Sequence, residues 1–169
     1  LQSGSDKILK LMKRRYLRNV YESRFEYIRK RIPNACIGSD VIVGFPGEDE
    51  LEFTETYNFL KSIDISYLHV FSYSERSNTS SIILNKKVSK IIKNERSKIL
   101  RELSNSKKLE FYKKNVNNHH NVLFETENKN GYIYGYTENH VRVKSLWSNS
   151  KQNKILNCYL DGIDTDFNC

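Results

Sequence analysis

The stretch Ile37–Glu48, IGSDVIVGFPGE, constrains the fold more than any other part of the sequence. Small and β-forming residues run up to Val43, and the loop Gly44–Gly47 then breaks the pattern. Three acidic residues follow at once and open a helical pattern. A buried strand, a tight loop and a helix N-terminus in succession indicate a β/α unit. Because ligands of parallel α/β proteins bind where such strands end, we predict a site at this loop.

The neighbouring segments predict the rest of an α/β unit. Ser5 can cap a short helix, and a second helix is expected over about 19–32, where Pro33 ends it. Apolar residues at helical spacing predict a third helix over 50–63, and 65–72 is rich in β-branched and aromatic residues. The order strand, helix, strand is what a parallel βαβ crossover requires.

The second half of the chain changes character twice. Residues 89–115 predict one long, lysine-rich helix, and 117–121 are interpreted as a linker whose two histidines are solvated rather than metal-bound. The last fifty residues alternate in short strands, and Asn130-Gly131 is a strong hairpin signal. Five or so short strands suggest a small barrel resembling an OB-fold. The predicted domains are therefore 1–85, a connecting helix over 86–118, and 119–169.

The formal net charge of +8 is unevenly distributed along the chain. Residues 1–33 carry ten basic against three acidic residues, and residues 86–114 carry eleven against three. The acidic block 34–85 lies between them, with two basic against eight acidic residues. Two basic blocks suggest contact with a polyanion such as nucleic acid. Ordinary solvated helix surfaces would give the same composition, so charge alone leaves both interpretations open.

Cysteine usage and hydropathy narrow the class of protein. Cys36, Cys158 and Cys169 form no CxxC motif and no cluster, which argues against a disulfide scaffold and a self-contained metal site. We interpret them as buried or idle thiols. The N-terminus is not signal-like, and no stretch approaches the roughly 18 apolar residues of a membrane span. We therefore expect a soluble, cytoplasmic protein without membrane partners.

Three segments together resemble a known family. They are LQSGSDKILKLMKRRY, IGSDVIVGFPGE and YLHVFSYSERSNT, and their order and spacing are similar to the C-terminal half of a radical S-adenosylmethionine (radical SAM) barrel. Followed by a basic helix and a small β-barrel, they resemble the tRNA methylthiotransferases, whose last module is the TRAM domain. The phrase VFSYSERSNT is similar to the branch that modifies threonylcarbamoyl-adenosine beside the anticodon. The implied fold class is α/β: half of a TIM-like parallel barrel, then an all-β, OB-like barrel.

The resemblance implies a set of cofactor-binding residues. Gln2 and Asp40 occupy the places that hold ribose hydroxyls, and both side chains suit vicinal hydroxyls. Arg14, with Arg15 as the alternative, matches the arginine that meets the methionine carboxylate. The adenine would pack against backbone near the two strand ends, at Val43, Gly44 and Phe71 to Tyr73. Without the resemblance, Asp40 would be interpreted as a satisfied buried carboxylate and Arg14 as a helix-end cation.

The chain departs from the family in one large respect. The family cleaves S-adenosylmethionine with a 4Fe-4S cluster held by a CxxxCxxC motif, and carries a second cluster, whereas this sequence has neither set of cysteines. The resemblance therefore implies a C-terminal piece that is inactive alone, and we assign it no catalytic or metal-ligating residue. Half of a parallel barrel exposes an edge and an inner face, so we expect self-association or a rearranged half-barrel.

The alternative function is an RNA-binding module without chemistry. Such a module would hold a tRNA anticodon stem-loop by stacking bases on aromatic rings and pairing phosphates with cations. Aromatic residues available for stacking are Tyr132, Tyr134, Tyr136, His140 and Trp147. The candidate RNA-binding residues are Arg76, Lys107, Lys108, Tyr136, Arg142 and Lys144. A third reading, a phosphate-binding α/β enzyme, is disfavoured because acidic residues stand where the phosphate would lie.

Overall fold

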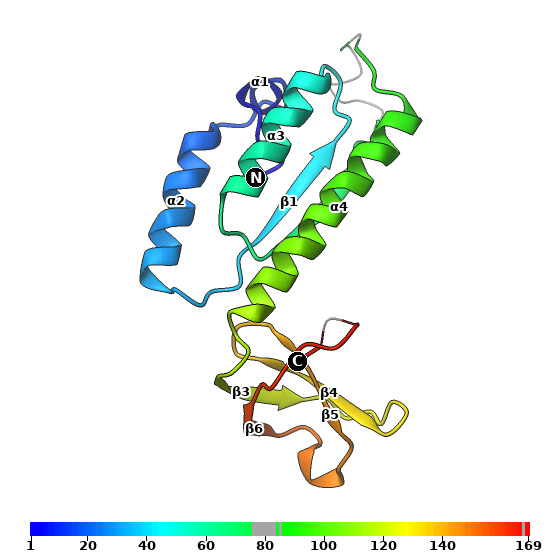
Figure 1. The fold of residues 1–169 in the computed structure, drawn as a ribbon. Coiled ribbons are helices and arrows are strands. Elements are labelled where there is room, and N and C mark those ends of the chain that lie inside the picture. The colour runs from blue at the N-terminus through cyan, green and yellow to red at the C-terminus, as the bar shows by residue number, and fades with distance from the viewer. Residues whose placement is uncertain (76–83, 85, 167) are drawn as a thin grey trace. The chain divides into compact units, whose positions relative to one another are not determined.

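The structure of the protein, a computed structural model, describes residues 1–169 except 76–83, 85 and 167. The chain divides into two compact units, Leu1–Lys107 and Lys108–Cys169, and the division falls within one long helix. Figure 1 labels most of the helices and strands of both units.

Unit 1 is a mixed α/β unit built on a short parallel sheet. Its elements are α1 (Asp6–Leu11), α2 (Arg18–Arg31), β1 (Gly38–Val43), α3 (Glu50–Ser62), β2 (Tyr67–Ser72) and the larger part of α4 (Lys90–Lys113). Strands β1 and β2 pair in parallel, with Val41 opposite Val70. A parallel bridge from Gln2 to Val41 extends the pairing beyond β1. The predicted strand–helix–strand order is confirmed.

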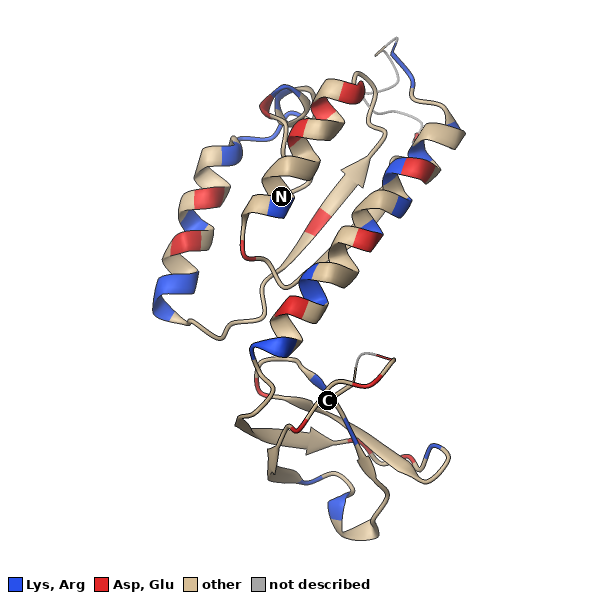
Figure 2. Cartoon of the chain, viewed as in Figure 1, with Lys and Arg blue, Asp and Glu red and all other residues tan. Residues whose placement is uncertain are grey.

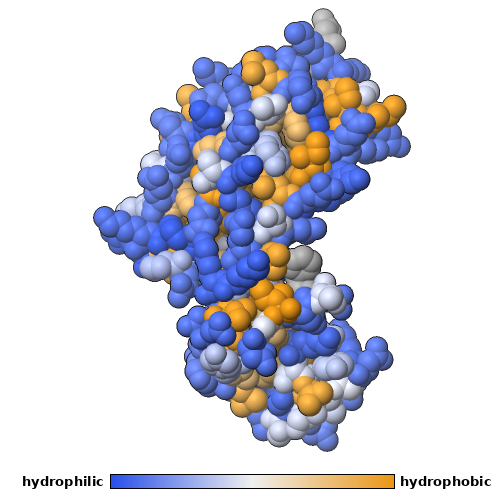
Figure 3. Space-filling model, viewed as in Figure 1, coloured by the Kyte–Doolittle hydropathy of each residue, from blue (hydrophilic) through white to orange (hydrophobic). Residues whose placement is uncertain are grey.

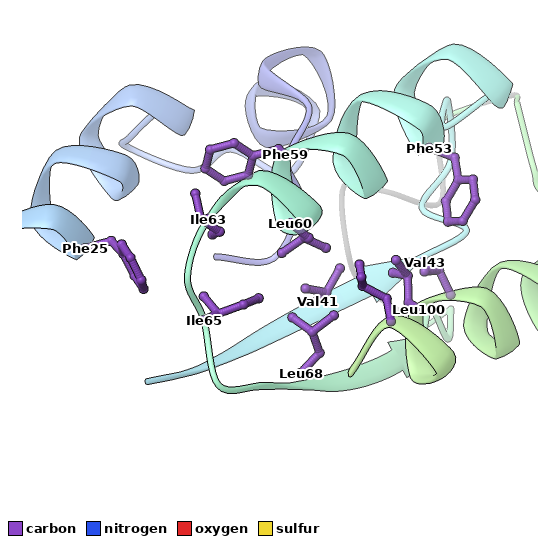
Figure 4. Close-up of a cluster of buried hydrophobic side chains, with 11 residues drawn as sticks. Phe25, Val41, Val43, Phe53, Phe59, Leu60, Ile63, Ile65, Leu68 and Leu100 are labelled. Carbon is purple, nitrogen blue, oxygen red and sulfur yellow. The ribbon is translucent and has the colours of Figure 1, made fainter. Parts of the chain in front are cut away.

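The core of unit 1 lies on one face of this sheet. Along β1, Ser39, Val41 and Val43 are buried, whereas Asp40 is exposed and Ile42 is intermediate, so successive side chains face opposite sides. Helices α2, α3 and α4 all contribute to the cluster on the buried face. Figure 4 shows Leu60 and Leu100 close to Val41, Val43 and Leu68. The three helices therefore cover one face of the parallel sheet and leave its other face uncovered.

The helix ends explain part of the local sequence. Asp49 and Glu52 form a capping box at the start of α3, which accounts for two of the acidic residues after the loop. Ser5 stands at the start of α1 but makes no side-chain cap hydrogen bond, contrary to expectation. In α2 only Phe25 is buried, while Ile28 and Ile32 are exposed, so the predicted apolar face packs only in part.

Unit 2 contains a four-stranded antiparallel sheet in the order β5-β4-β3-β6. The strands are β3 (His119–Phe124), β4 (Tyr132–Thr137), β5 (Arg142–Leu146) and β6 (Ile155–Tyr159), with a 3-10 turn, η2 (Asn149–Lys151), before the last. Asn130 and Gly131 both have positive φ, and Lys129 and Tyr132 exchange two backbone hydrogen bonds around them. The predicted two-residue hairpin is confirmed.

The predicted linker over 117–121 is wrong in its second half. Strand β3 already begins at His119, and its residues pair with β6 from His119 opposite Tyr159 onward. The burial of this strand alternates strictly, which places His120 inside and its neighbours outside. The outward-facing residues at the start of this strand are polar, so the sequence of the segment resembles that of a solvated loop.

Hydrophilic residues cover most of the face drawn in Figure 3, with smaller hydrophobic patches among them. Large apolar side chains that are exposed include Phe71, Leu146 and Ile155. Within the described part of the chain, every helix is too short or too polar to traverse a lipid bilayer.

Candidate functional site

The candidate site lies on the uncovered face of the parallel sheet in unit 1. The register places Asp40 opposite His69 and Ile42 opposite Phe71. Paired residues of parallel strands point to the same side, so these four side chains share the face that the helices leave open. Phe71 is 53% exposed, which is high for a phenylalanine within a strand. This face offers both a carboxylate and apolar surface to a partner or ligand.

Three residues predicted to bind the cofactor meet at one edge of β1. The Gln2 backbone N–H donates to the Asp40 carbonyl at 2.8 Å, and the Ile42 N–H donates to the Gln2 carbonyl at 2.9 Å. The Arg14 guanidinium donates to Oε1 of Gln2 at 3.0 Å. The side chain of Asp40 is exposed, so the alternative of a buried, satisfied carboxylate does not apply. Gln2 therefore contacts both the Arg14 side chain and the main chain of Asp40, and their role in binding a cofactor stays a prediction.

A hollow of about 180 Å³ lies beside this edge. Its lining includes the guanidinium-bearing Arg14, the aromatic residues Phe45 and Tyr73, and Ile42 from β1. The rings of Phe45 and Tyr73 meet edge to face with their centroids 5.0 Å apart. The Tyr73 N–H donates to the Val43 carbonyl at 2.9 Å, which ties the two strand ends together. Apolar and aromatic walls with a cation at the rim suit a nucleoside that carries an anionic group.

The loop after β1 needs its first glycine. Gly44 has φ +75°, a conformation that side-chain-bearing residues rarely adopt. A Cβ at this position would lie 2.3 Å from Cγ of Lys93 on α4. The Gly44 N–H donates to Oε1 of Glu48 at 2.8 Å, so the loop is closed by its own carboxylate. The predicted loop site therefore has a defined backbone geometry that helix α4 supports.

Glu48 forms a buried ion pair that the sequence analysis missed. Glu48 and Arg96 are 4% and 5% exposed, and Nη1 of Arg96 lies 2.8 Å from Oε1 of Glu48. Burial raises the pKa of Glu48, although the Gly44 N–H and Arg96 both act to lower it. The partners are 48 residues apart. No local sequence pattern predicts such a pair, and the sequence alone indicates only that Glu48 lies near the start of a helix.

The basic residues proposed for RNA contact fall in different environments. Arg76 lies outside the described residues. Lys107 is buried rather than exposed, because its ammonium donates to the carbonyls of Lys61 and Ile63, both at 2.8 Å, at the end of α3. Lys108 lies with its ammonium 5.1 Å from the ring centre of Tyr112. Figure 2 shows basic residues along α4 with acidic residues between them, so α4 presents mixed charge.

In unit 2 the three remaining candidates come together on one face of the sheet. Tyr136 pairs with Arg142 and Tyr134 pairs with Lys144 across β4 and β5. The Arg142 guanidinium lies 4.9 Å from the ring centres of both Tyr134 and Tyr136, and it donates to the Tyr136 hydroxyl at 2.6 Å. The Lys144 ammonium lies 4.5 Å from the ring centre of Tyr132. We call these five residues, Tyr132, Tyr134, Tyr136, Arg142 and Lys144, the cation–aromatic face.

Two carboxylates moderate the charge of this face. Glu125 accepts from Arg142 at 3.2 Å, and Asp164 accepts from Lys144 at 3.0 Å. Desolvation acts to raise the pKa of Asp164, but hydrogen bonds from Asn168 and Lys144 outweigh it and lower that pKa to about 2. Asp164 therefore remains ionised at neutral pH. Each cation of the face has a carboxylate partner, so the face carries little net charge.

Among the residues that the structure describes, no three or more His, Cys, Asp or Glu side chains gather as they would around a metal ion. All three cysteines are of intermediate exposure, and none forms a disulfide within the described part of the chain.

Comparison with known proteins gives a consistent set of relatives. The chain is 46% identical over 144 residues to the threonylcarbamoyladenosine tRNA methylthiotransferase MtaB of Aquifex aeolicus, which covers 85% of this chain and 34% of that protein. It is 40% identical over 148 residues to the protein of the same name from Bacillus subtilis, covering 85% of this chain and 33% of that protein.

A relative with a different name matches a slightly shorter part. The tRNA-2-methylthio-N(6)-dimethylallyladenosine synthase of Syntrophus aciditrophicus is 41% identical over 129 residues, which are 76% of this chain and 28% of that protein. No family model matches the chain.

The chain thus spans about a third of the length of the relatives that it matches. The identity extends over most of its own length, and the matched portions are the C-terminal parts of those proteins. The chain is homologous to the C-terminal parts of the tRNA methylthiotransferases.

Proposed function

We propose that this chain is the C-terminal part of a radical SAM tRNA methylthiotransferase that acts on threonylcarbamoyl-adenosine next to the anticodon. The relatives named for that nucleoside are 46% and 40% identical to it. In this proposal unit 1 is half of a parallel barrel that carries part of a nucleoside site, and unit 2 is a TRAM-like barrel.

The observation that carries the proposal is that Arg14, which lines the hollow at the strand ends, contacts Gln2, and that Gln2 hydrogen-bonds the main chain of Asp40. Arg14 would bind the methionine carboxylate through its guanidinium fork, and the Gln2 amide that it contacts would fix its orientation. Asp40 and Gln2 would accept and donate hydrogen bonds to the ribose hydroxyls. The adenine would lie against the apolar and aromatic wall at the rim of the sheet.

In the family that the sequence resembles, S-adenosylmethionine supplies the methyl group and, together with a 4Fe-4S cluster, the means of activating the adenine ring. The residues of this chain hold and orient that cofactor in our proposal, and none of them is assigned to the chemistry. Because the sequence contains no CxxxCxxC motif, we expect the 169 residues alone to have no methylthiotransferase activity.

The experiment is a calorimetric titration of the chain with S-adenosylmethionine. Arg14→Gln should weaken binding by about tenfold or more, since it removes a charge-assisted contact to a carboxylate. Arg24→Gln, at an exposed arginine of α2, is the matched control, because it removes the same charge away from the site and should leave the affinity unchanged. Equal effects of the two substitutions, or no binding by the unaltered chain, would refute the cofactor assignment.

A second function, RNA binding by unit 2, is favoured by the cation–aromatic face. Tyrosine rings offer stacking surfaces, and Arg142 and Lys144 offer cations beside them on neighbouring strands. Stacking on rings and pairing with backbone phosphates are the two contacts that single-stranded RNA uses most. Because Glu125 and Asp164 already contact these cations, we expect stacking to contribute more than phosphate pairing.

This function is tested with an anticodon stem-loop at two salt concentrations. Arg142→Gln should weaken binding, whereas Lys154→Gln, an exposed lysine elsewhere in unit 2, should not. The salt dependence should be shallow, since few phosphates are neutralised. Binding that is absent, or that is equally sensitive to both substitutions, would leave the face without an RNA-binding role.

A further inference from the structure

Two side chains of α4 reach the ends of both parallel strands. Arg96 contacts the loop after β1 through Glu48, and Lys93, one turn earlier, contacts the end of β2 at Tyr73. We propose that Lys93 and Arg96 are positioning residues, which hold the two strand ends in the arrangement that receives the nucleoside. That a nucleoside is received there rests on the proposed function, whereas the contacts of Lys93 and Arg96 are present without any ligand.

Arg96 acts on the loop through one carboxylate. Oε1 of Glu48 accepts from Nη1 of Arg96 and from the Gly44 N–H, both at 2.8 Å. The same Nη1 donates to the Glu48 backbone carbonyl at 3.1 Å, so a single guanidinium nitrogen fixes both the main chain and the side chain. Because Glu48 is almost fully buried, loss of its partner would leave an unpaired charge in the protein interior.

The Phe53 ring completes the setting of Arg96. The guanidinium carbon lies 5.1 Å from the centre of that ring, so the arginine is held against α3 as well as against the loop. Nη2 contacts the exposed Glu50 at 3.3 Å. An arginine whose guanidinium contacts carboxylates and also lies near an aromatic ring has little freedom to move. Arg96 on α4 therefore fixes the position of Glu48 together with the Gly44 N–H of the loop.

Lys93 acts on the second strand end and on the same glycine. Its ammonium donates to the Tyr73 carbonyl at 3.1 Å and lies 5.3 Å from the centre of the Tyr73 ring. Its Cγ occupies the space next to Gly44 that a side chain would otherwise fill. Tyr73 in turn packs its ring against Phe45 of the loop. Lys93 thus joins the two strand ends at the wall where the adenine is expected.

The test measures hydrogen exchange of the Gly44 amide by NMR in the full 169-residue chain. Arg96→Met should accelerate this exchange by about tenfold or more, because the carboxylate that accepts the Gly44 N–H is no longer fixed. Lys93→Met keeps the aliphatic stem beside Gly44 but removes the ammonium that donates to the Tyr73 carbonyl. It should therefore change the NMR chemical shifts around Tyr73 rather than the exchange of the Gly44 amide. Arg101→Gln, an exposed arginine on the same helix, is the matched control and should leave both regions unchanged.

A paired variant keeps the inference testable if Arg96→Met does not fold. Glu48→Gln with Arg96→Met removes both charges and retains an oxygen that can accept the Gly44 N–H. This double variant should fold, and its Gly44 amide should exchange more slowly than in Arg96→Met but faster than in the unaltered chain. Gly44 exchange within about twofold of the unaltered chain, in whichever of the two variants folds, would overturn the inference.

A parallel titration with S-adenosylmethionine separates this inference from the proposed function. If the unaltered chain binds the cofactor, Arg96→Met should weaken binding by about fivefold or more while Arg101→Gln does not. If the unaltered chain does not bind, the proposed function fails, and the exchange of the Gly44 amide still decides whether Arg96 holds the loop.

Discussion

At the residue scale, Gly44 meets two requirements that no other residue type satisfies. Its φ of +75° favours glycine, and its missing side chain leaves room for the stem of Lys93. Gly131 at the hairpin of unit 2 has a similar φ of +82°, yet nothing lies within 4 Å of a Cβ built there. Comparing substitutions at the two glycines therefore separates two costs of adding a side chain: the strain of a positive φ, which both share, and the steric clash with Lys93, which only Gly44 has.

Alanine substitution at these two positions should give different losses of stability. Gly131→Ala should lower the free energy of unfolding of unit 2 by about 1–2 kcal/mol, the usual cost of a left-handed residue with a side chain. Gly44→Ala should lower that of unit 1 by more, because Lys93 must also move away. Urea unfolding of both variants measures the difference. A smaller loss at Gly44 than at Gly131 would contradict the crowding by Lys93.

Local sequence specified Gly44 but not its partners. A glycine after a run of β-forming residues predicts a turn, and the structure confirms that position. The Glu48–Arg96 pair joins residues 48 positions apart, so only the packing of α4 onto the loop creates it. Likewise, the contact of Arg14 with Gln2 joins residues 12 positions apart and depends on how the chain returns after α1. The resemblance to a family names Arg14 and Gln2, which periodicity alone would not, but it does not name the Glu48–Arg96 pair.

At the scale of elements, Lys107 links two helices. It lies on α4 and donates to two carbonyls at the C-terminal end of α3, those of Lys61 and Ile63. Carbonyls at a helix C-terminus have no partner within the helix, and a buried ammonium can satisfy them. A lysine on a basic helix looked like an RNA contact in the sequence because burial of its head group has no sequence signature.

Substitution of Lys107 should therefore affect stability and not RNA affinity. Lys107→Met should lower the free energy of unfolding by about 1.5–3 kcal/mol, since hydrogen bonds from a charged donor to buried carbonyls are lost. Lys108→Met, at the next position on the helix, is the control and should cost less. Thermal unfolding and a stem-loop titration measure the two properties. Unchanged stability together with weakened RNA binding would show that Lys107 contacts RNA after all.

Strand periodicity was easier to predict where the strands were apolar. The hairpin at Asn130-Gly131 and the pairing of β1 with β2 follow the pattern of the sequence. Strand β3 was partly missed because its outward positions are polar and only His120, Val122 and Phe124 point inward. The helices are well predicted by their apolar spacing, although Ile28 and Ile32 of α2 stay exposed. Exposed apolar residues on a helix do not reveal which face is buried.

At the scale of the whole molecule, the uncovered face of the parallel sheet is expected to determine whether the chain associates with itself. Phe71 is 53% exposed there and lies opposite Ile42. Burying a side chain of this size contributes about 1.5–3 kcal/mol, so contact between two such faces is favourable. We therefore propose that the chain self-associates through this face when nothing else covers it.

Light scattering over a range of concentrations tests the association. The unaltered chain should show a mass that rises with concentration, and Phe71→Ser should shift the rise to higher concentration. Leu146→Ser removes a large apolar residue of unit 2 that is even more exposed, at 70%, and serves as the control. A concentration-independent monomer, or an equal response to both substitutions, would show that the open face does not mediate association.

The central claim is that the ends of two parallel strands form part of a nucleoside site, and chemical-shift mapping with S-adenosylmethionine tests it most directly. The account predicts amide shift changes confined to unit 1, at Gln2, at 40–44 and at Tyr73, with unit 2 unaffected. Changes centred on unit 2, or no changes at concentrations that saturate comparable sites, would contradict it.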